Sequence, residues 1–296
     1  MKILECVPNF SEGRDKAKVE GIIEQIRMVD KVKLLDYSLD EDHNRSVVTF
    51  IGEPDKVSEA ALRACLKAFE LIDMRRHSGA HPRLGAVDVV PFVPIRGLEL
   101  EEAVEVAHKF GKELGKTAAV PIYFYEEAAI RPERRSLPAI RKGEYEGLKE
   151  KMKAPQWVPD AGPRRFNPKT GATIVGARHP LIAFNVNINT RDVEIVKKIA
   201  RTVRFIDGGF HYVRAIGVSL GEKGICQISM NLLNYHKTPI HRVFEAIRSE
   251  TSRYGLEIVG SEIVGLIPVE ALAEAASFYL RTHEFTPDQV IENRLL

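Results

Sequence analysis

The chain has 296 residues, of which 44% are hydrophobic and 28% charged, and its formal net charge is +2 at pH 7. At roughly 100–200 residues per domain, this length favours two domains. The apolar content excludes a disordered or collagen-like chain. The near-neutral charge gives no general argument for binding nucleic acid or an anionic membrane.

Neither a membrane span nor a secretory signal is expected. No stretch approaches the ~20 apolar residues of a membrane helix, and Glu5 and Pro8 interrupt the N-terminus where a signal peptide needs an apolar run. Cys6, Cys65 and Cys226 are far apart and lack CxxC spacing. We therefore expect a cytoplasmic protein without disulfides or a cysteine-rich zinc site.

In chain order, the first half predicts strand, helix, strand, strand, helix, strand, followed by one more helix and strand. Pro54 suits the first turn of the second helix, whereas Pro91 indicates an edge or a bulge in its strand. The order βαββαβ is that of a ferredoxin-like sheet. The predicted strands are 3–8, 32–37, 46–52, 87–94 and 120–125, and the predicted helices are 15–28, 54–73 and about 100–115.

The second half repeats this order of elements without evident sequence identity. Thr238 is a candidate N-cap, with Pro239 at the first helical position. We therefore predict an α/β (α+β) chain with two ferredoxin-like βαββαβ units, a common fold that says little about function by itself. The predicted strands here are 181–188, 213–220, 224–230 and 257–266, and the predicted helices are 191–204, 239–254 and 269–280.

Residues 131–172 are rich in Arg, Lys, Gly and Pro. Within them, 137–152 has the composition of a charged surface helix, and 155–171 carries strong turn signals. The segment is either an interdomain linker or a binding loop, because connections of this length in compact proteins often bind ligands.

Segment 73–88, DMRRHSGAHPRLGAVD, carries the clearest chemical signal. Its histidines exchange protons near neutral pH, and its arginines have the geometry to hold carboxylates. Such a loop could serve an acyl-type transfer from an anionic substrate. The alternative is a solvated connection whose charges have no role.

His77 and His81 stand four residues apart, which raises the hypothesis of a metal site in a hydrolase. Ser78, Gly79 and Pro82 disfavour the helix that would place both rings on one face. The HExxH pattern is also absent. The spacing alone is therefore a weak argument for a metal.

Two strands of the second half have an unusual polar face. Alternation places Ala183, Asn185 and Asn187 on one side of their strand, opposite Ile182, Phe184, Val186 and Ile188. Gln227, Ser229 and Asn231 likewise share a face. Asn is disfavoured in strands, so these side chains either bind a ligand or form an ordinary solvated face.

Residues 162–171, GPRRFNPKTG, form a basic, turn-rich loop. Arg164, Arg165 and Lys169 suit an anionic ligand, and Phe166 offers a stacking surface. The order of a P-loop is absent. RNA binding would use the same residue types, although the balanced charge elsewhere argues against it.

Motifs along nearly the whole chain are similar to those of the formiminotransferase domain family, which occurs alone or fused to a cyclodeaminase. The matching segments are ECVPNFSEGR at 5–14, HNRSVVTFIG at 43–52, LIDMRRHSGAHPRLGAVDVVPFVP at 71–94, SLPAIRKGEYEGL at 136–148, VPDAGPRRFNP at 158–168, GATIVGAR at 171–178, LIAFNVNI at 181–188, QISMNLLNY at 227–235 and EIVGSEIVGLIP at 257–268.

The resemblance implies an N-terminal subdomain, 1–177, and a C-terminal subdomain, 178–296, with folate bound between them. It implies glutamate formimidoyltransferase activity, in which the formimino group of N-formimino-L-glutamate moves to N5 of tetrahydrofolate in histidine degradation and one-carbon metabolism. Tetrahydrofolate would be a co-substrate, with no metal, nucleic acid or membrane involved, and a homodimer is left open.

The family's catalytic histidine falls on His81. Its folate loop falls on Gly162, Pro163, Arg164, Arg165, Phe166, Asn167, Pro168, Lys169, Thr170 and Gly171.

The chemistry of the transfer suggests roles for further residues. N5 must lose a proton and the departing glutamate nitrogen must gain one, so one imidazole acts as base and then as acid. Arg45, Arg83 and Arg178 are candidates for the glutamate carboxylates. The amides of Asn185, Asn187, Gln227 and Asn231 suit the pterin, and the basic side chains of the loop suit the polyglutamate tail.

Two other functions stay open at this point. An enzyme with the same fold could move a formyl group between 5-formyltetrahydrofolate and glutamate. A non-catalytic folate-binding module is the alternative from a different class, and the loop that contains His81 is the feature against it.

Overall fold

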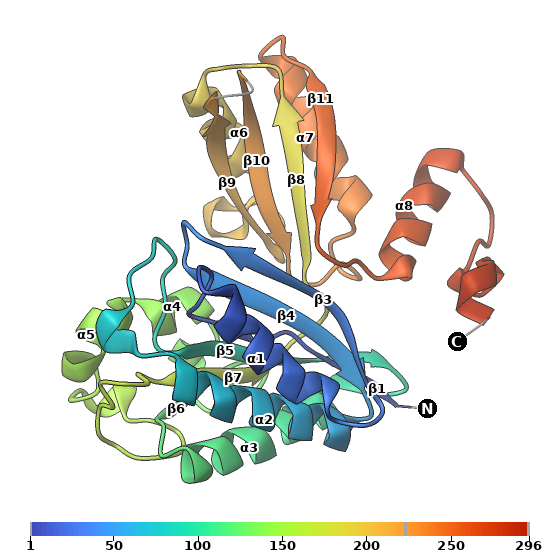
Figure 1. The fold of residues 1–296 in the computed structure, drawn as a ribbon. Helices are drawn as coiled ribbons and strands as arrows, with labels where there is room; N and C mark the ends of the chain where they lie inside the picture. The colour runs from blue at the N-terminus through green and yellow to red at the C-terminus, as the bar shows by residue number, and fades with distance from the viewer. Residues whose placement is uncertain (1, 222–223, 295–296) are drawn as a thin grey trace. The chain divides into compact units, whose positions relative to one another are not determined.

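The computed structural model describes residues 2–221 and 224–294. The chain divides into two compact units, unit 1 up to residue 178 and unit 2 from residue 179 (Figure 1). Each unit has its own sheet and helices, which confirms the predicted fold class. In the part of the chain that is described, no helix is long and apolar enough to span a bilayer.

Unit 1 is built on a seven-stranded sheet. Across it the strands run β3, β4, then β1 and β2 in line, β5, β7 and β6. The first five form the antiparallel arrangement that the βαββαβ order predicts. The strands are β1 (Ile3–Cys6), β2 (Asn9–Phe10), β3 (Val32–Asp40), β4 (Arg45–Gly52), β5 (Val87–Arg96), β6 (Ile122–Glu126) and β7 (Thr173–Ala177).

Strand β7 was not predicted from the sequence. It lies between β5 and β6, parallel to both, and all five of its residues are buried. Its apolar run is short, contains Gly176 and follows a turn-rich segment, so neither the length nor the pattern of the run distinguishes a strand from a loop here.

Of the two alternatives for Pro91, the edge is wrong, because β5 is paired on both sides; its pairing with β1 and β2 does contain register shifts. The irregularity lies in the neighbouring strand, which breaks at residues 7–8 between β1 and β2. At that break the Val7 N–H donates to the Pro91 carbonyl at 3.3 Å. Pro91 has no N–H to donate, and it therefore lies opposite the place where the hydrogen bonds to the neighbouring strand are already interrupted.

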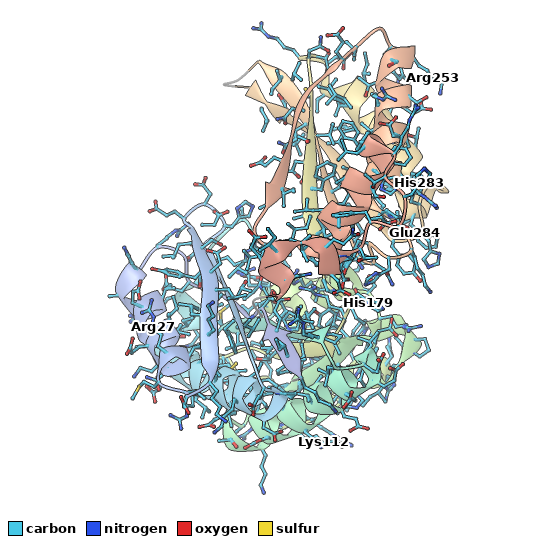
Figure 2. The ribbon with its side chains drawn as sticks, turned by 90° about the vertical axis from the view of Figure 1, so that its right-hand side faces the viewer. Arg27, Lys112, His179, Arg253, His283 and Glu284 are labelled. Atoms are coloured by element: carbon cyan, nitrogen blue, oxygen red, sulfur yellow. The ribbon has the colours of Figure 1, made fainter. Side chains whose placement is uncertain are left out.

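Three amphipathic helices cover one face of this sheet, and Figure 1 shows them side by side. They bury alanine, valine and isoleucine side chains against β4 and β5 in one core. Charged side chains such as Lys112 point away from that core (Figure 2). The helices are α1 (Lys16–Arg27), α2 (Pro54–Leu71) and α3 (Leu100–Thr117).

The segment 131–172 packs on the opposite face, so its interpretation as an interdomain linker is wrong. Ile140 and Leu148 are fully buried in a second core with Tyr123 and Ile174. The single helix predicted over 137–152 is two helices, α4 (Leu137–Arg141) and α5 (Glu144–Lys151). They are separated at Gly143, whose φ of +88° only glycine adopts readily.

Unit 2 is a four-stranded antiparallel sheet in the order β11, β8, β10, β9, with α6 and α7 packed on one face and α8 against α7. This is the ferredoxin-like order predicted from the sequence. Helix α7 begins at Ile240 with an extended Pro239 as its N-cap, so Thr238 does not cap it. The elements are β8 (Ile182–Ile188), α6 (Val193–Val203), β9 (Val213–Leu220), β10 (Ile225–Leu232), α7 (Ile240–Arg253), β11 (Ile258–Val264) and α8 (Val269–Leu280).

Candidate functional site

The loop that contains His81 is docked against the turn between β3 and β4. Asn44, at a φ of +47°, accepts from the Gly13 N–H through Oδ1 at 3.0 Å and donates to the Ser78 carbonyl through Nδ2 at 2.9 Å. A Cβ at Gly79 would lie 2.8 Å from the Cβ of Asn44. The close approach therefore requires glycine at this position.

The same loop is tied on its other side to the end of the 162–171 loop. The Ala86 N–H donates to the Thr170 carbonyl at 2.9 Å, and the Met74 N–H donates to the Lys169 carbonyl at 2.9 Å. The structure therefore brings together two segments that the sequence analysis considered separately. Both belong to unit 1.

His81 faces a cation instead of a carboxylate. Its Nε2 lies 2.8 Å from Arg45 Nη1, so the guanidinium donates, Nε2 accepts, and the ring proton resides on Nδ1. Burial and the charges of Arg45 and Arg141 lower the pKa of His81 to about 3. The imidazole is consequently neutral at physiological pH, the form that can accept a proton.

Arg141, at the end of α4, is a member of this cluster that the sequence analysis did not single out. It forms an ion pair with Asp88, which is buried and also accepts from the Leu84 N–H at 2.9 Å. The Nε atoms of Arg141 and Arg45 are buried without a hydrogen-bond partner among the residues described. Unsatisfied cationic donors favour an anion. Only the 136–148 motif of the family resemblance pointed to this residue.

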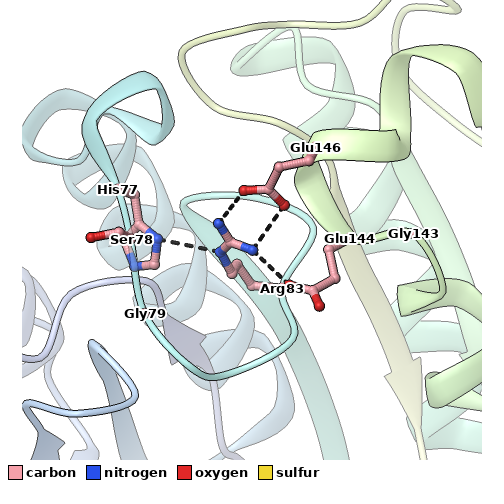
Figure 3. Close-up of a pocket in the computed structure, with 7 residues that line it drawn as sticks. All are labelled: His77, Ser78, Gly79, Arg83, Gly143, Glu144 and Glu146. Atoms are coloured by element: carbon pink, nitrogen blue, oxygen red, sulfur yellow. Dashed lines mark hydrogen bonds and ion pairs between the residues drawn. The ribbon is translucent and has the colours of Figure 1, made fainter.

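Arg83 has a different environment, shown in Figure 3. Its guanidinium donates to Glu144 Oε2 at 2.7 Å and to Glu146 Oε2 at 3.0 Å, and its Nε donates to His77 Nδ1 at 3.3 Å. Only 5% of the residue is exposed. Because two carboxylates already neutralise it, we do not retain Arg83 as a receptor for the substrate.

His77 is engaged through both ring nitrogens. Nδ1 accepts from Arg83, and Nε2 donates to the Asn44 carbonyl at 3.0 Å. An open hollow of about 520 Å³ lies beside these side chains (Figure 3). It is lined by His77, Ser78, Gly79, Arg83, Gly143, Glu144 and Glu146. These contacts give His77 a structural role in holding the loop.

The metal hypothesis finds no support in these contacts. Over residues 2–221 and 224–294, no group of three or more His, Cys, Asp or Glu side chains is arranged to hold a metal ion. His77 and His81 each have an arginine on one ring nitrogen. A second cation at either ring would meet charge repulsion.

Arg178 follows β7, and its N–H donates to the Phe92 carbonyl at 3.2 Å. Its charge acts on Tyr125 and on Glu5, whose pKa is raised by burial and partly restored by Arg178. The charges that act on His81 are instead those of Arg45, Arg141, His43 and Asp40. Arg141 also acts on Tyr125, so Arg178 and this member of the His81 cluster share a neighbour.

The 162–171 loop combines buried anchors with exposed cations. Asn167 Oδ1 accepts from the Lys169 N–H at 3.0 Å, and Phe166 packs on Tyr145 with ring centroids 5.5 Å apart. Arg164 and Arg165 are exposed and make no hydrogen bond or ion pair with the described residues. Lys169 Nζ reaches the Glu70 carbonyl at 3.3 Å. Phe166 is thus an anchor of the loop, and the two arginines are its accessible charges.

The polar face predicted for unit 2 is confirmed by strand register. Gln227 lies opposite Asn187, Ser229 opposite Asn185, and Asn231 opposite Ala183. Gln227 Nε2 donates to Asn187 Oδ1 at 2.9 Å and to Glu262 Oε2 at 3.3 Å. Glu262 comes from β11, where the sequence analysis noted no site residue. These side chains point away from the apolar core under α6 and α7.

Comparisons with known proteins cover both units. The family model described as "Formiminotransferase domain, N-terminal subdomain" matches residues 3–178, and the model "Formiminotransferase domain" matches residues 183–293. The chain is 45% identical to a glutamate formimidoyltransferase of Streptococcus pyogenes, over 100% of this chain and 99% of that protein.

A glutamate formimidoyltransferase of Thermoplasma acidophilum is 48% identical, over 100% of this chain and 98% of that protein. A formimidoyltransferase-cyclodeaminase of Rattus norvegicus is 46% identical, but the match covers 94% of this chain and only 52% of the longer rat protein.

Proposed function

The chain belongs to the formiminotransferase family, and on that premise we propose that it uses His81 to move the formimino group of N-formimino-L-glutamate to N5 of tetrahydrofolate. The products are 5-formimidoyltetrahydrofolate and L-glutamate. The observation that carries the assignment to His81 is a neutral imidazole held beside two arginines in a loop fixed at both ends.

His81 balances the proton changes of the transfer. As N5 bonds to the formimino carbon, its proton passes to the imidazole. When the bond between that carbon and the glutamate nitrogen breaks, the imidazolium returns the proton to the departing nitrogen. One group thus serves both steps, and such transfer contributes about 10²–10⁴-fold to the rate.

The substrate-binding roles follow from charge and hydrogen-bonding capacity. Arg45 holds a carboxylate of formiminoglutamate beside His81, and Arg178 is the candidate for the other. The exposed Arg164 and Arg165 of the 162–171 loop suit the anionic tail of folate. Asn185, Asn187, Gln227 and Asn231 of unit 2 present the mixed donors and acceptors that a pterin needs.

The setting we propose for the enzyme is the cytoplasm, with small molecules as its partners. Cys6, Cys65 and Cys226 are all unpaired and buried, which suits a reducing compartment. Acid–base chemistry at His81 accounts for the transfer without assigning a metal. A homodimer is compatible with this function.

An assay with two donors tests the proposal. Purified protein is incubated with tetrahydrofolate and either formiminoglutamate or formylglutamate, and the folate product is identified. We expect 5-formimidoyltetrahydrofolate from the first donor at the higher rate. Product from the formyl donor alone would establish formyl transfer instead, and no product from either would favour a binding module.

A further inference from the structure

The lone pair that His81 needs as a base is already occupied in the structure. Nε2 accepts from Arg45 Nη1 at 2.8 Å, and Nδ1 carries the ring proton. A base in this state accepts a proton only if the guanidinium withdraws. The structure therefore requires an agent that moves Arg45 away from the ring.

The charges around His81 indicate what that agent is. Asp88 forms an ion pair with Arg141, whereas among the described residues the Arg45 side chain forms no ion pair and, besides its bond to His81, donates to Asn9 Oδ1 at 3.3 Å. Asp40, whose charge acts on Arg45 as does that of Asp88, is hydrogen-bonded to His43 Nδ1 at 2.7 Å. Among the residues described, Arg45 thus has no carboxylate in direct contact, and the Nε atoms of both arginines are buried without hydrogen-bond partners.

We propose that Arg45 and Arg141 together bind the α-carboxylate of the glutamyl substrate, and that this carboxylate frees His81 by drawing Arg45 off its Nε2. The inference rests on the proposed function and adds Arg141 as a binding residue. The α-carboxylate is the relevant one because its carbon bears the nitrogen that leaves. Substrate binding thereby creates the base in the place where it is needed.

Arg141 is held in a suitable position for this role. Lys151 Nζ donates to the carbonyls of Ala139, Ile140 and Lys142 at 3.1, 2.6 and 2.9 Å. These are carbonyls that the end of α4 leaves without helical partners. The lysine therefore fixes the last turn of α4, from which Arg141 reaches Asp88.

The proposal predicts a change in the titration of His81 when the site fills. The charged groups that act on the ring are Arg45 from β4, Arg141 from α4, His43 from the β3–β4 turn and Asp40 from β3. The two arginines lower the pKa and Asp40 raises it. A carboxylate bound to the arginines offsets their charge and moves the pKa upward, toward the ordinary value of about 6.5.

The test is an NMR titration of the whole protein labelled at histidine Cε1, with the His81 resonance identified by its absence from His81→Asn. L-Glutamate, the reaction product, is the probe, and its binding is measured by calorimetry. We expect the midpoint to rise by at least about one pH unit at saturation, a tenfold gain in proton affinity. Bound glutamate that leaves the midpoint unchanged would overturn the proposal.

Two variants of equal charge loss sharpen the result. Arg141→Gln should raise the midpoint of the free protein and weaken glutamate about 10–100-fold, as expected for loss of a charged hydrogen-bonding partner. Lys142→Gln removes a charge from an exposed position one residue away. It should change the proton affinity of His81 and the affinity for glutamate by less than about twofold each. Equal effects of the two variants would contradict a specific role for Arg141.

Arg141→Lys covers the case in which the glutamine variant fails to fold. It keeps the charge but loses the planar fork, so we expect an intermediate glutamate affinity. Affinity equal to that of the parent would count against the proposal. Because the NMR readout needs no turnover, normal formimino transfer with an unresponsive His81 would refute this inference while leaving the proposed function intact.

Discussion

The cluster around His81 in unit 1 and the polar strand face of unit 2 differ in the charge of their side chains and in the elements that hold them. In unit 1, His81 lies on a loop, Arg45 at the start of β4 and Arg141 at the end of α4, and the buried Nε atoms of both arginines lack a hydrogen-bond partner among the residues described. In unit 2, the amides of Asn187 and Gln227 lie on regular paired strands and hydrogen-bond to each other. An unsatisfied charged cluster suits a step in which charge changes. A row of amides that bond to one another and to Glu262 suits recognition of a ligand.

This contrast separates the expected effects of mutation. Changes at the His81 cluster should act on the rate of the chemical step. Changes on the sheet face of unit 2 should act on the affinity for folate.

The largest effect is expected for His81→Asn. Asparagine is polar but cannot exchange a proton near neutral pH, so kcat should fall by about 10²–10⁴-fold while folate affinity stays close to that of the parent. Steady-state kinetics with both substrates saturating gives kcat, and calorimetry gives the affinity. A variant with near-normal kcat would exclude His81 as the proton carrier.

The matched control is His43→Asn. His43 packs edge-on near His81, with ring centroids 6.2 Å apart, and its side chain is half exposed. We expect its kcat to stay within about threefold of the parent. His77 is a poorer control because both of its ring nitrogens hold the loop. His77→Asn should lower thermal stability as well as activity.

On the sheet of unit 2, Gln227→Leu removes the donor to Asn187 and Glu262 with little change in volume. Loss of about one net hydrogen bond to the ligand should weaken tetrahydrofolate about tenfold and leave kcat at saturation unchanged. Ser261→Ala, on the neighbouring β11 but on the other face, is the control. A fall in kcat without loss of affinity would contradict the assignment.

A smaller effect is expected in the 162–171 loop. Arg165→Gln should raise KM for a tetrahydrofolate polyglutamate by about threefold and change KM for the monoglutamate little, because one exposed charge is removed. The difference should shrink in ~0.5 M salt as screening increases. Lys112→Gln, which removes a charge from the solvent side of α3 (Figure 2), should affect neither substrate.

The element order and the polar strands could be predicted from sequence because they follow from local periodicity. β7 could not, since its buried run is short and its partners β5 and β6 are distant in sequence. The same holds for side-chain partners. The sequence gives no sign that Glu144 and Glu146 neutralise Arg83, or that Arg141 acts on His81, because both contacts depend on how 131–172 folds back onto the sheet.

Apart from activity, the low pKa of His81 predicts an effect on acid stability. The pKa of His81 is about 3 in the folded protein and about 6.5 when unfolded. Between these values the unfolded state binds a proton that the folded state does not, so this contribution to stability is full above about pH 6.5 and is lost as pH falls. Urea unfolding at about pH 7 and pH 5 should show a smaller loss for His81→Asn than for the parent. An equal loss of stability in the two proteins would mean that folding does not lower the pKa of His81.

The most direct test of the separation between proton transfer at His81 and the proposed recognition of the pterin on the sheet of unit 2 is a single-turnover measurement. The rate of formimino transfer is recorded against tetrahydrofolate concentration for the parent, His81→Asn and Gln227→Leu. We predict that His81→Asn lowers the limiting rate and keeps the half-saturating concentration, and that Gln227→Leu raises that concentration and keeps the limiting rate. If each variant changed both the limiting rate and the half-saturating concentration, the account would be contradicted.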